Sequence, residues 1–190
     1  MRTRIASLLV LAAWLTPIGA AGTIYVHGTA GNDAWDGRCP TWNGGTCGPK
    51  RTIQAGIDVA VAGDEVILAP VTYTGTGNKD VDFLGKAITV RSEAPNDPNV
   101  VAATVVDCQA NEANPHRGFN FVAGEVRDSV LAGITIRGGW GPPECWPGGP
   151  DFSAAGAILC RRTSPTIRFC MLTQNQAAWG AGMISYGGCP

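Results

Sequence analysis

Hydrophobic and polar positions alternate over short stretches of this chain, which predicts short β-strands more often than helices. Thr23–His27 alternates apolar and polar side chains, as a half-buried strand does, and Glu65–Ala69 has the apolar run of a buried strand. Only Thr52–Val61 carries apolar residues at helical spacing, and Gly63 follows it as a stop signal. The pattern therefore predicts a mostly β protein with one amphipathic helix.

Short apolar motifs recur along the chain at intervals of 22 to 26 residues, once 140–151 is treated as a 12-residue insertion. The recurring segments are 66–68, 88–90, 134–136, 156–159 and 182–185. Such a period, built from short strands, is the signature of a solenoid whose turns bury their apolar faces by stacking in parallel. The insertion 140–151 contains four prolines, so we expect it to leave the ladder as a loop.

The helix precedes the first repeat, where a solenoid has an exposed core end and exposed strand edges. We therefore expect Thr52–Val61 to cap the first coil; an unrelated surface helix is the alternative. The expected organisation is a signal peptide at 1–21, a strand, disulfide loop and capping helix at 22–64, and β-coils at 65–190.

Residues 1–21 have the features of a secretory signal peptide. Arg2 and Arg4 precede the apolar run Ile5–Leu15, and the small residues Gly19–Ala21 suit a cleavage site. A membrane anchor is the alternative, but the run is shorter than the roughly 20 apolar residues that span a bilayer. We expect a secreted or cell-surface protein without a transmembrane segment.

Seven cysteines in an exported protein indicate disulfide bonding. Cys39 and Cys47 have seven residues between them in a loop rich in Gly, Pro and Trp, so we predict that they pair. A zinc site would need a second close pair of ligands, which this loop lacks. The pairing of the others stays open: Cys108, Cys145, Cys160, Cys170 and Cys189.

Composition excludes some functions. The formal net charge is −1, so no basic field attracts nucleic acid or an anionic membrane. Hydrophobic residues make up 45% of the chain, enough for a packed core, and the 26 Gly and 13 Pro favour many tight turns.

Several segments together resemble the start of pectin-lyase-like parallel β-helix proteins and the repeats of secreted bacterial β-helix proteins, including the polymorphic outer-membrane protein type. The segments that carry the resemblance are 52–58, 63–69, 72–74, 82–92, 105–108, 129–136 and 164–170. It spans roughly Thr23 to the end and implies a right-handed parallel β-helix. Family members usually have more coils, so it also implies an N-terminal fragment, truncated at its C-terminal end. The family includes lyases, hydrolases and adhesins, so the resemblance specifies fold rather than activity.

A pectate-type elimination would need carboxylates that hold Ca²⁺ and a basic arginine on one outer face. The candidates are Asp80, Asp82, Asp107, Asp128, Arg91, Arg117 and Arg137. Asp80 and Asp82 are expected to alternate along one strand and so to share a face, and a hard cation needs several such oxygens. The alternative is that all seven are solvated surface or turn residues. We interpret His27 and His116 as surface or capping residues.

Aromatic residues suggest a different role. Trp140 and Trp146 flank the proline-rich insertion and could stack on sugar rings or simply pack the loop. Trp35 and Trp42 are expected to form a small core inside the disulfide loop.

The favoured hypothesis is a non-catalytic exported β-helix module with a surface, adhesion or glycan-contact role. One alternative is a polysaccharide lyase or glycoside hydrolase whose catalytic coils lie beyond residue 190; another is a structural spacer. We expect a monomer with a polysaccharide partner and no nucleic acid, no bound metal and no cofactor, with Ca²⁺ as the one candidate ion. The candidate substrate-binding residues are Trp140, Trp146, Asp80, Asp82, Arg91 and Arg137.

Overall fold

The computed structural model describes residues 21–146 and 149–187. The predicted signal peptide at 1–21 lies outside the described residues except for its last position, and so does Cys189. Among the residues described, no helix has the length and apolar character needed to cross a membrane.

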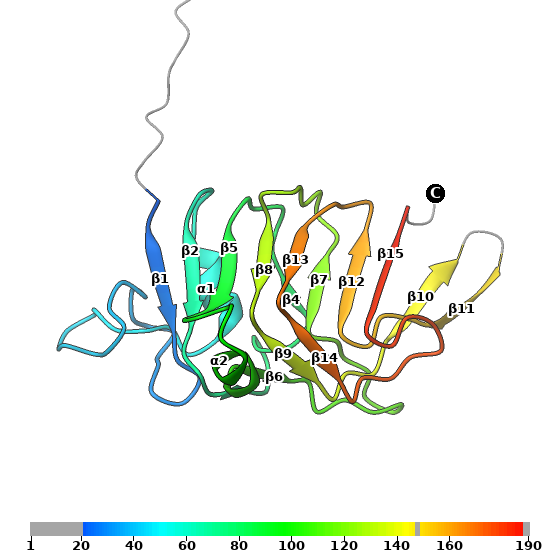
Figure 1. The fold of residues 1–190 in the computed structure, drawn as a ribbon, viewed down its shortest axis with the longest axis horizontal. Coiled ribbons are helices and arrows are strands. Elements are labelled where there is room, and N and C mark those ends of the chain that lie inside the picture. The colour runs from blue at the N-terminus through cyan, green and yellow to red at the C-terminus, as the bar shows by residue number, and fades with distance from the viewer. Residues whose placement is uncertain (1–20, 147–148, 188–190) are drawn as a thin grey trace, which may run out of the picture.

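Three parallel sheets form the framework of the described chain (Figure 1). The first sheet has the order β1 (Thr23–Val26), β2 (Glu65–Leu68), β5 (Thr89–Ser92), β8 (Val130–Ala132) and β13 (Thr166–Arg168). The second has the order β3 (Thr72–Tyr73), β6 (Val105–Asp107), β9 (Thr135–Arg137) and β14 (Met171–Thr173). The third has the order β4 (Val81–Asp82), β7 (Phe119–Phe121), β12 (Ile158–Arg161) and β15 (Met183–Tyr186).

The chain visits the three sheets in the same order on every pass. The passes are β2, β3 and β4; then β5, β6 and β7; then β8, β9 and β12; and finally β13, β14 and β15. Each strand pairs in parallel with the equivalent strand of the next pass and not with its neighbour in sequence. The fold is therefore mostly β with parallel sheets, in a β-helix-like arrangement.

Columns of apolar side chains run across the sheets and form the core. In the first sheet the paired positions are Ile24, Val66, Val90, Leu131 and Ile167. The first four of these side chains are fully buried. Stacking like side chains on successive strands removes apolar area from water at every level, which is the main force that holds the passes together.

The register corrects the repeat spacing predicted from the sequence. Val66 pairs with Val90, 24 residues later, so the predicted 22-residue offset to Ile88 is wrong. The segment 134–136 lies in the second sheet and is not equivalent to 66–68. Leu159 pairs with Ile184, so the predicted 26-residue offset is too long by one. The error at Val66 is a two-residue slip, which preserves the inward and outward alternation of a strand, so the pattern alone did not reveal it.

Helix α1 (Ile53–Val59) lies against β1, β2 and β4. The Thr52 side chain caps it by accepting a hydrogen bond from the Ala55 N–H at 3.2 Å. Ile53 and Ile57 are fully buried, whereas Val61 is exposed because the helix ends before it. A Cβ at Gly56 would lie 2.7 Å from Val26, so only glycine lets the helix approach the strands this closely.

A second helix, α2 (Pro98–Ala103), was not predicted because six residues are too few to show helical periodicity. Its start does carry a local signal. The Asp97 side chain accepts from the Asn99 N–H at 2.9 Å, and Pro98 occupies the first turn.

The proline-rich insertion is a hairpin outside the three sheets, at the end of the molecule where β15 lies (Figure 1). Strands β10 (Pro143–Trp146) and β11 (Gly149–Ser153) pair only with each other, antiparallel. The insertion predicted at 140–151 does leave the parallel ladder, but its described part contains paired strands where a loop was expected.

The predicted disulfide between Cys39 and Cys47 is confirmed, with the two Cα atoms 5.4 Å apart. Trp35 and Trp42 stack in this loop with ring centres 5.8 Å apart and nearly parallel planes. The described loop is thus held by one covalent bond and one aromatic pair.

Candidate functional site

The carboxylates of Asp80 and Asp82 hold the backbone at turns. Asp80 has a left-handed φ of 52° and precedes β4, so it does not alternate with Asp82 along one strand. Asp80 Oδ2 lies 2.5 Å from His116 Nδ1, and Asp80 Oδ1 accepts a hydrogen bond from the Arg117 N–H at 2.9 Å. Asp82 accepts from the Leu84 N–H at 2.7 Å. These contacts explain both residues without a bound cation.

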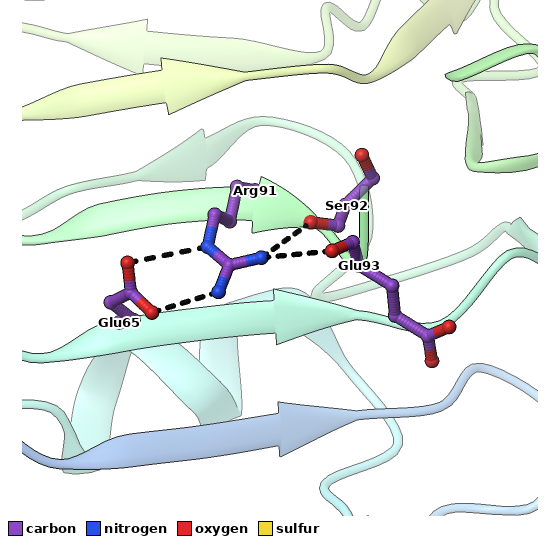
Figure 2. Close-up of polar contacts among 4 residues, drawn as sticks. All are labelled: Glu65, Arg91, Ser92 and Glu93. Atoms are coloured by element: carbon purple, nitrogen blue, oxygen red, sulfur yellow. Dashed lines mark hydrogen bonds and ion pairs between the residues drawn. The ribbon is translucent and has the colours of Figure 1, made fainter. Parts of the chain in front are cut away.

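Arg91 is engaged by protein oxygens on the outer face of the first sheet (Figure 2). Its Nη2 lies 2.9 Å from Glu65 Oε2, and its Nη1 donates to the carbonyls of Ser92 and Glu93 at 3.0 and 3.1 Å. The hydrogen bond from Arg91 holds the pKa of Glu65 below its ordinary value. Arg91 therefore joins β2 to β5.

Arg137 has the same structural role in the second sheet. Its Nε and Nη2 lie 3.1 and 2.9 Å from Asp107 Oδ2 on the neighbouring strand. Asp107 also accepts from the Gln109 N–H, at a corner where Gln109 has a left-handed φ of 50°.

The remaining charged candidates are dispersed. Arg117 is 3% exposed, and its guanidinium donates to the carbonyls of Ala154 and Ala155 at 3.0 and 3.2 Å. Asp128 is exposed in the turn before β8. His27 Nδ1 accepts from the Ala30 N–H at 3.2 Å. Across residues 21–146 and 149–187, no three His, Cys, Asp or Glu side chains gather as a metal site.

The structure therefore does not assemble the predicted elimination site in its described part. Arg91 lies in the first sheet, Arg137 in the second, and Asp80 and Asp82 at the third.

The free thiols are not poised as nucleophiles. Burial raises the pKa of Cys108 to about 12 and that of Cys160 to about 11, and it also raises the pKa of Cys170. A thiol in apolar surroundings stays protonated near neutral pH, so it neither attacks a substrate nor binds a metal readily.

A groove of about 530 Å³ lies beside the base of the hairpin, and its volume is within the range of ligand pockets. Its lining includes Glu112, Pro115, Trp140, Pro143, Ser153 and Gln176. Pro143 belongs to β10 and Ser153 to β11, so the hairpin supplies one wall. The half-buried Trp140 supplies an aromatic surface beside polar side chains, which suits a ligand with both apolar and hydroxylated faces.

Three separate passes of the chain meet at Trp140. Its N–H donates to the His116 carbonyl at 2.8 Å, and the two residues pair as an antiparallel bridge. Trp140 also pairs in parallel with Gln176. Side chains of laterally paired residues project to the same face, so His116, Trp140 and Gln176 form one row. The contact between its Nδ1 and the Asp80 carboxylate anchors His116 at the end of this row.

Of the residues predicted as substrate-binding, only Trp140 lines this groove. Trp146 belongs to β10, but its side chain lies outside the described part of the chain. Sequence reasoning missed Glu112, Ser153 and Gln176, because no motif connects them. The one sequence signal for this groove was the proline-rich insertion next to Trp140, which indicated a segment outside the sheets that could form one of its walls.

A second groove, of about 390 Å³, lies between α2 and the β13–β14 turn. It is lined largely by apolar side chains, including Pro95, Pro98, Val101, Phe169 and Met171. Phe169 is 58% exposed there, and it offers an aromatic residue for comparison with Trp140.

Neither a protein-family model, nor a curated protein, nor a solved structure matches this chain.

Proposed function

We propose that this chain is an exported β-helix module that binds glycan in the groove beside Trp140. The observation that carries the proposal is the juxtaposition of an aromatic side chain with Gln176, Ser153 and Glu112 in one groove. Sugar rings present apolar C–H faces and hydroxyl edges. An indole face can stack on the former, and amide, hydroxyl and carboxylate groups can hydrogen-bond the latter.

We infer further that the three sheets are coils of a right-handed solenoid similar to the pectin-lyase-like proteins. From β2 onward, every crossover between parallel strands of one sheet passes through the other two sheets. Parallel crossovers are right-handed in about 98% of known cases, because twisted strands favour that hand. A crystal structure with left-handed coils would contradict this assignment.

Export is supported by two independent features. The N-terminal sequence has the charge, apolar run and small residues of a signal peptide. The Cys39–Cys47 disulfide suits an oxidising compartment. Mass spectrometry of protein recovered from the medium or cell surface should find a new N-terminus near Gly22. An intact Met1 in that fraction would contradict cleavage.

The rival function, a polysaccharide lyase or hydrolase with catalytic coils beyond residue 190, has less support from the described residues. Arg91 and Arg137 are each bound to a neighbouring strand, and Asp80 and Asp82 hold turns. A spacer role would leave the groove unexplained.

The test compares two aromatic variants by calorimetry and on a glycan array. Trp140→Ala removes the aromatic wall, and Phe169→Ala removes an exposed aromatic residue from the other groove. We expect Trp140→Ala to weaken glycan binding at least about tenfold, as removal of a central aromatic anchor does. Phe169→Ala should bind as the wild type does, and both variants should melt like it. Equal affinity in all three proteins would overturn the proposed site. Release of unsaturated or reducing ends by the wild type would favour the enzyme.

A further inference from the structure

We infer that the groove beside Trp140 selects neutral glycans and discriminates against polyuronates. This inference rests on the proposed function, because it names the ligand class of the same groove. It differs from the pectate-type elimination considered above, whose substrate is acidic.

The charges of the segments that line the groove carry the inference. The described lining residues lie within the segments 112–115, 140–143 and 176–178 and at Ser153, and they include one carboxylate and no Lys or Arg. Glu112 lines the groove and is exposed. A uronate carboxylate would therefore meet the exposed carboxylate of Glu112, and among the described lining residues it would find no arginine or lysine, the side chains that usually recognise this group.

The basic residues nearest in sequence do not supply the missing positive charge to the groove. Arg117 follows the first of these segments, but it is 3% exposed, and its guanidinium is turned inward to carbonyls that include those of Ala154 and Ala155. Lys79 lies beside Asp80 and does not line the groove. His116 faces Asp80, so its ring is already paired with a carboxylate.

The neutral groups that line the groove suit hydroxyls. Gln176 offers two donors and one acceptor oxygen, and Ser153 offers a hydroxyl, which donates to the Gly141 carbonyl at 2.6 Å and can still accept. Glu112 can accept from a sugar hydroxyl. Binding of this kind depends little on ionic strength, because no ion pair forms across the interface.

The experiment uses one sugar backbone in two charge states. Homogalacturonan oligosaccharides are compared as the fully methyl-esterified, neutral form and as the free acid, together with neutral xylo-, manno- and gluco-oligosaccharides. We expect the acidic form to bind at least about tenfold more weakly than the neutral form, since like charges across an interface cost more than the free energy of a tenfold change. If the protein binds only another neutral oligosaccharide, its enzymatically oxidised uronate form replaces the free acid. Neither added salt nor EDTA should weaken the neutral ligand.

A charge variant sharpens the test. Glu112→Lys places a cation in the groove and should narrow the gap between acidic and neutral forms by about three- to fivefold, the size of a surface charge effect. Glu93→Lys makes the same charge change at an exposed site in the loop after β5 and should leave the ratio unchanged. Acidic ligands that bind as tightly as neutral ones, with loss in Trp140→Ala, would overturn the inference while the glycan function stands. No Trp140-dependent binding of any glycan would overturn the proposed function itself.

Discussion

Variants of Glu65 and Arg91 test how strongly one ion pair joins β2 to β5 in the first sheet (Figure 2). Arg91 Nη2 lies 2.9 Å from Glu65 Oε2, and Nε lies 3.3 Å from Oε1, so one contact is short and the other is long. The Arg91 side chain is 20% exposed and that of Glu65 is 41% exposed. Because water screens the carboxylate, we expect a coupling energy of about 1 kcal/mol, the upper end for surface pairs.

The single variants should differ in a defined direction. Glu65→Gln leaves Arg91 with the carbonyls of Ser92 and Glu93 as acceptors, so it should lower the free energy of unfolding by about 1 kcal/mol. Arg91→Met also removes the donors to those carbonyls and should cost about 2 kcal/mol. Urea unfolding of both variants and the double variant closes the thermodynamic cycle.

The Asp107–Arg137 pair is the matched control. Both guanidinium contacts there reach the same oxygen, and Arg137 is 42% exposed, so we expect a smaller coupling energy. A Glu65–Arg91 coupling below about 0.3 kcal/mol, the usual limit of additivity, would refute the reasoning. A larger coupling for Asp107–Arg137 would refute it as well.

The coupling between Glu65 and Arg91 should also depend on pH. The hydrogen bond from Arg91 lowers the pKa of Glu65 from its ordinary value of 4.5 in the folded state. A carboxyl with a lowered folded-state pKa contributes its full stability above the unfolded-state pKa, and loses it as the pH falls through the folded-state pKa. The coupling should therefore be constant from neutral pH down to about 4.5 and shrink in more acidic solution. Coupling that stays unchanged in strong acid would contradict this assignment.

Three further outcomes are expected. Gly139→Ala would push a Cβ into the carbonyl oxygen of Gly156, so it should lower the free energy of urea unfolding by about 3 kcal/mol. In the control Gly182→Ala, the new Cβ meets its nearest neighbour at an ordinary 3.4 Å, so the free energy of unfolding should change by less than about 0.5 kcal/mol. Equal effects of the two substitutions would contradict the close approach at Gly139. Cys108 and Cys160, whose pKa values burial raises to about 12 and about 11, should resist iodoacetamide in the folded protein and react after denaturation; alkylation at equal rates in both states would show that these side chains are accessible. In hydrogen exchange, the amides of β8 should be protected more than those of β13, because no residue from 161 to 187 is buried; the opposite order would contradict that difference.

Local features of the chain could be predicted because their causes lie within a few residues. The alternation in Thr23–His27 and the apolar run at Glu65–Ala69 indicated β1 and β2. The spacing of Cys39 and Cys47 indicated their disulfide. Four prolines in the insertion indicated that it would leave the parallel ladder, although its pairing as an antiparallel hairpin was not foreseen.

The register between passes was decided by tertiary structure. Passes differ in length because α2 and the hairpin interrupt some of them, so a constant period misaligned the strands. Val66 pairs with Val90 because that offset stacks buried side chains, while a two-residue slip would look identical in the alternation.

The sequence by itself determined a mostly β chain, its disulfide loop, its excursion at Trp140 and its small net charge. Only the tertiary structure decided which side chains surround Trp140. Glu112, Ser153 and Gln176 lie on three separate segments, and backbone pairing of successive passes brings them together. The tertiary structure also places Arg91 and Arg137 in different sheets, where each forms an ion pair with a neighbouring strand. The physical reason is that local propensity acts within one strand or turn, whereas a groove depends on how passes of unequal length stack.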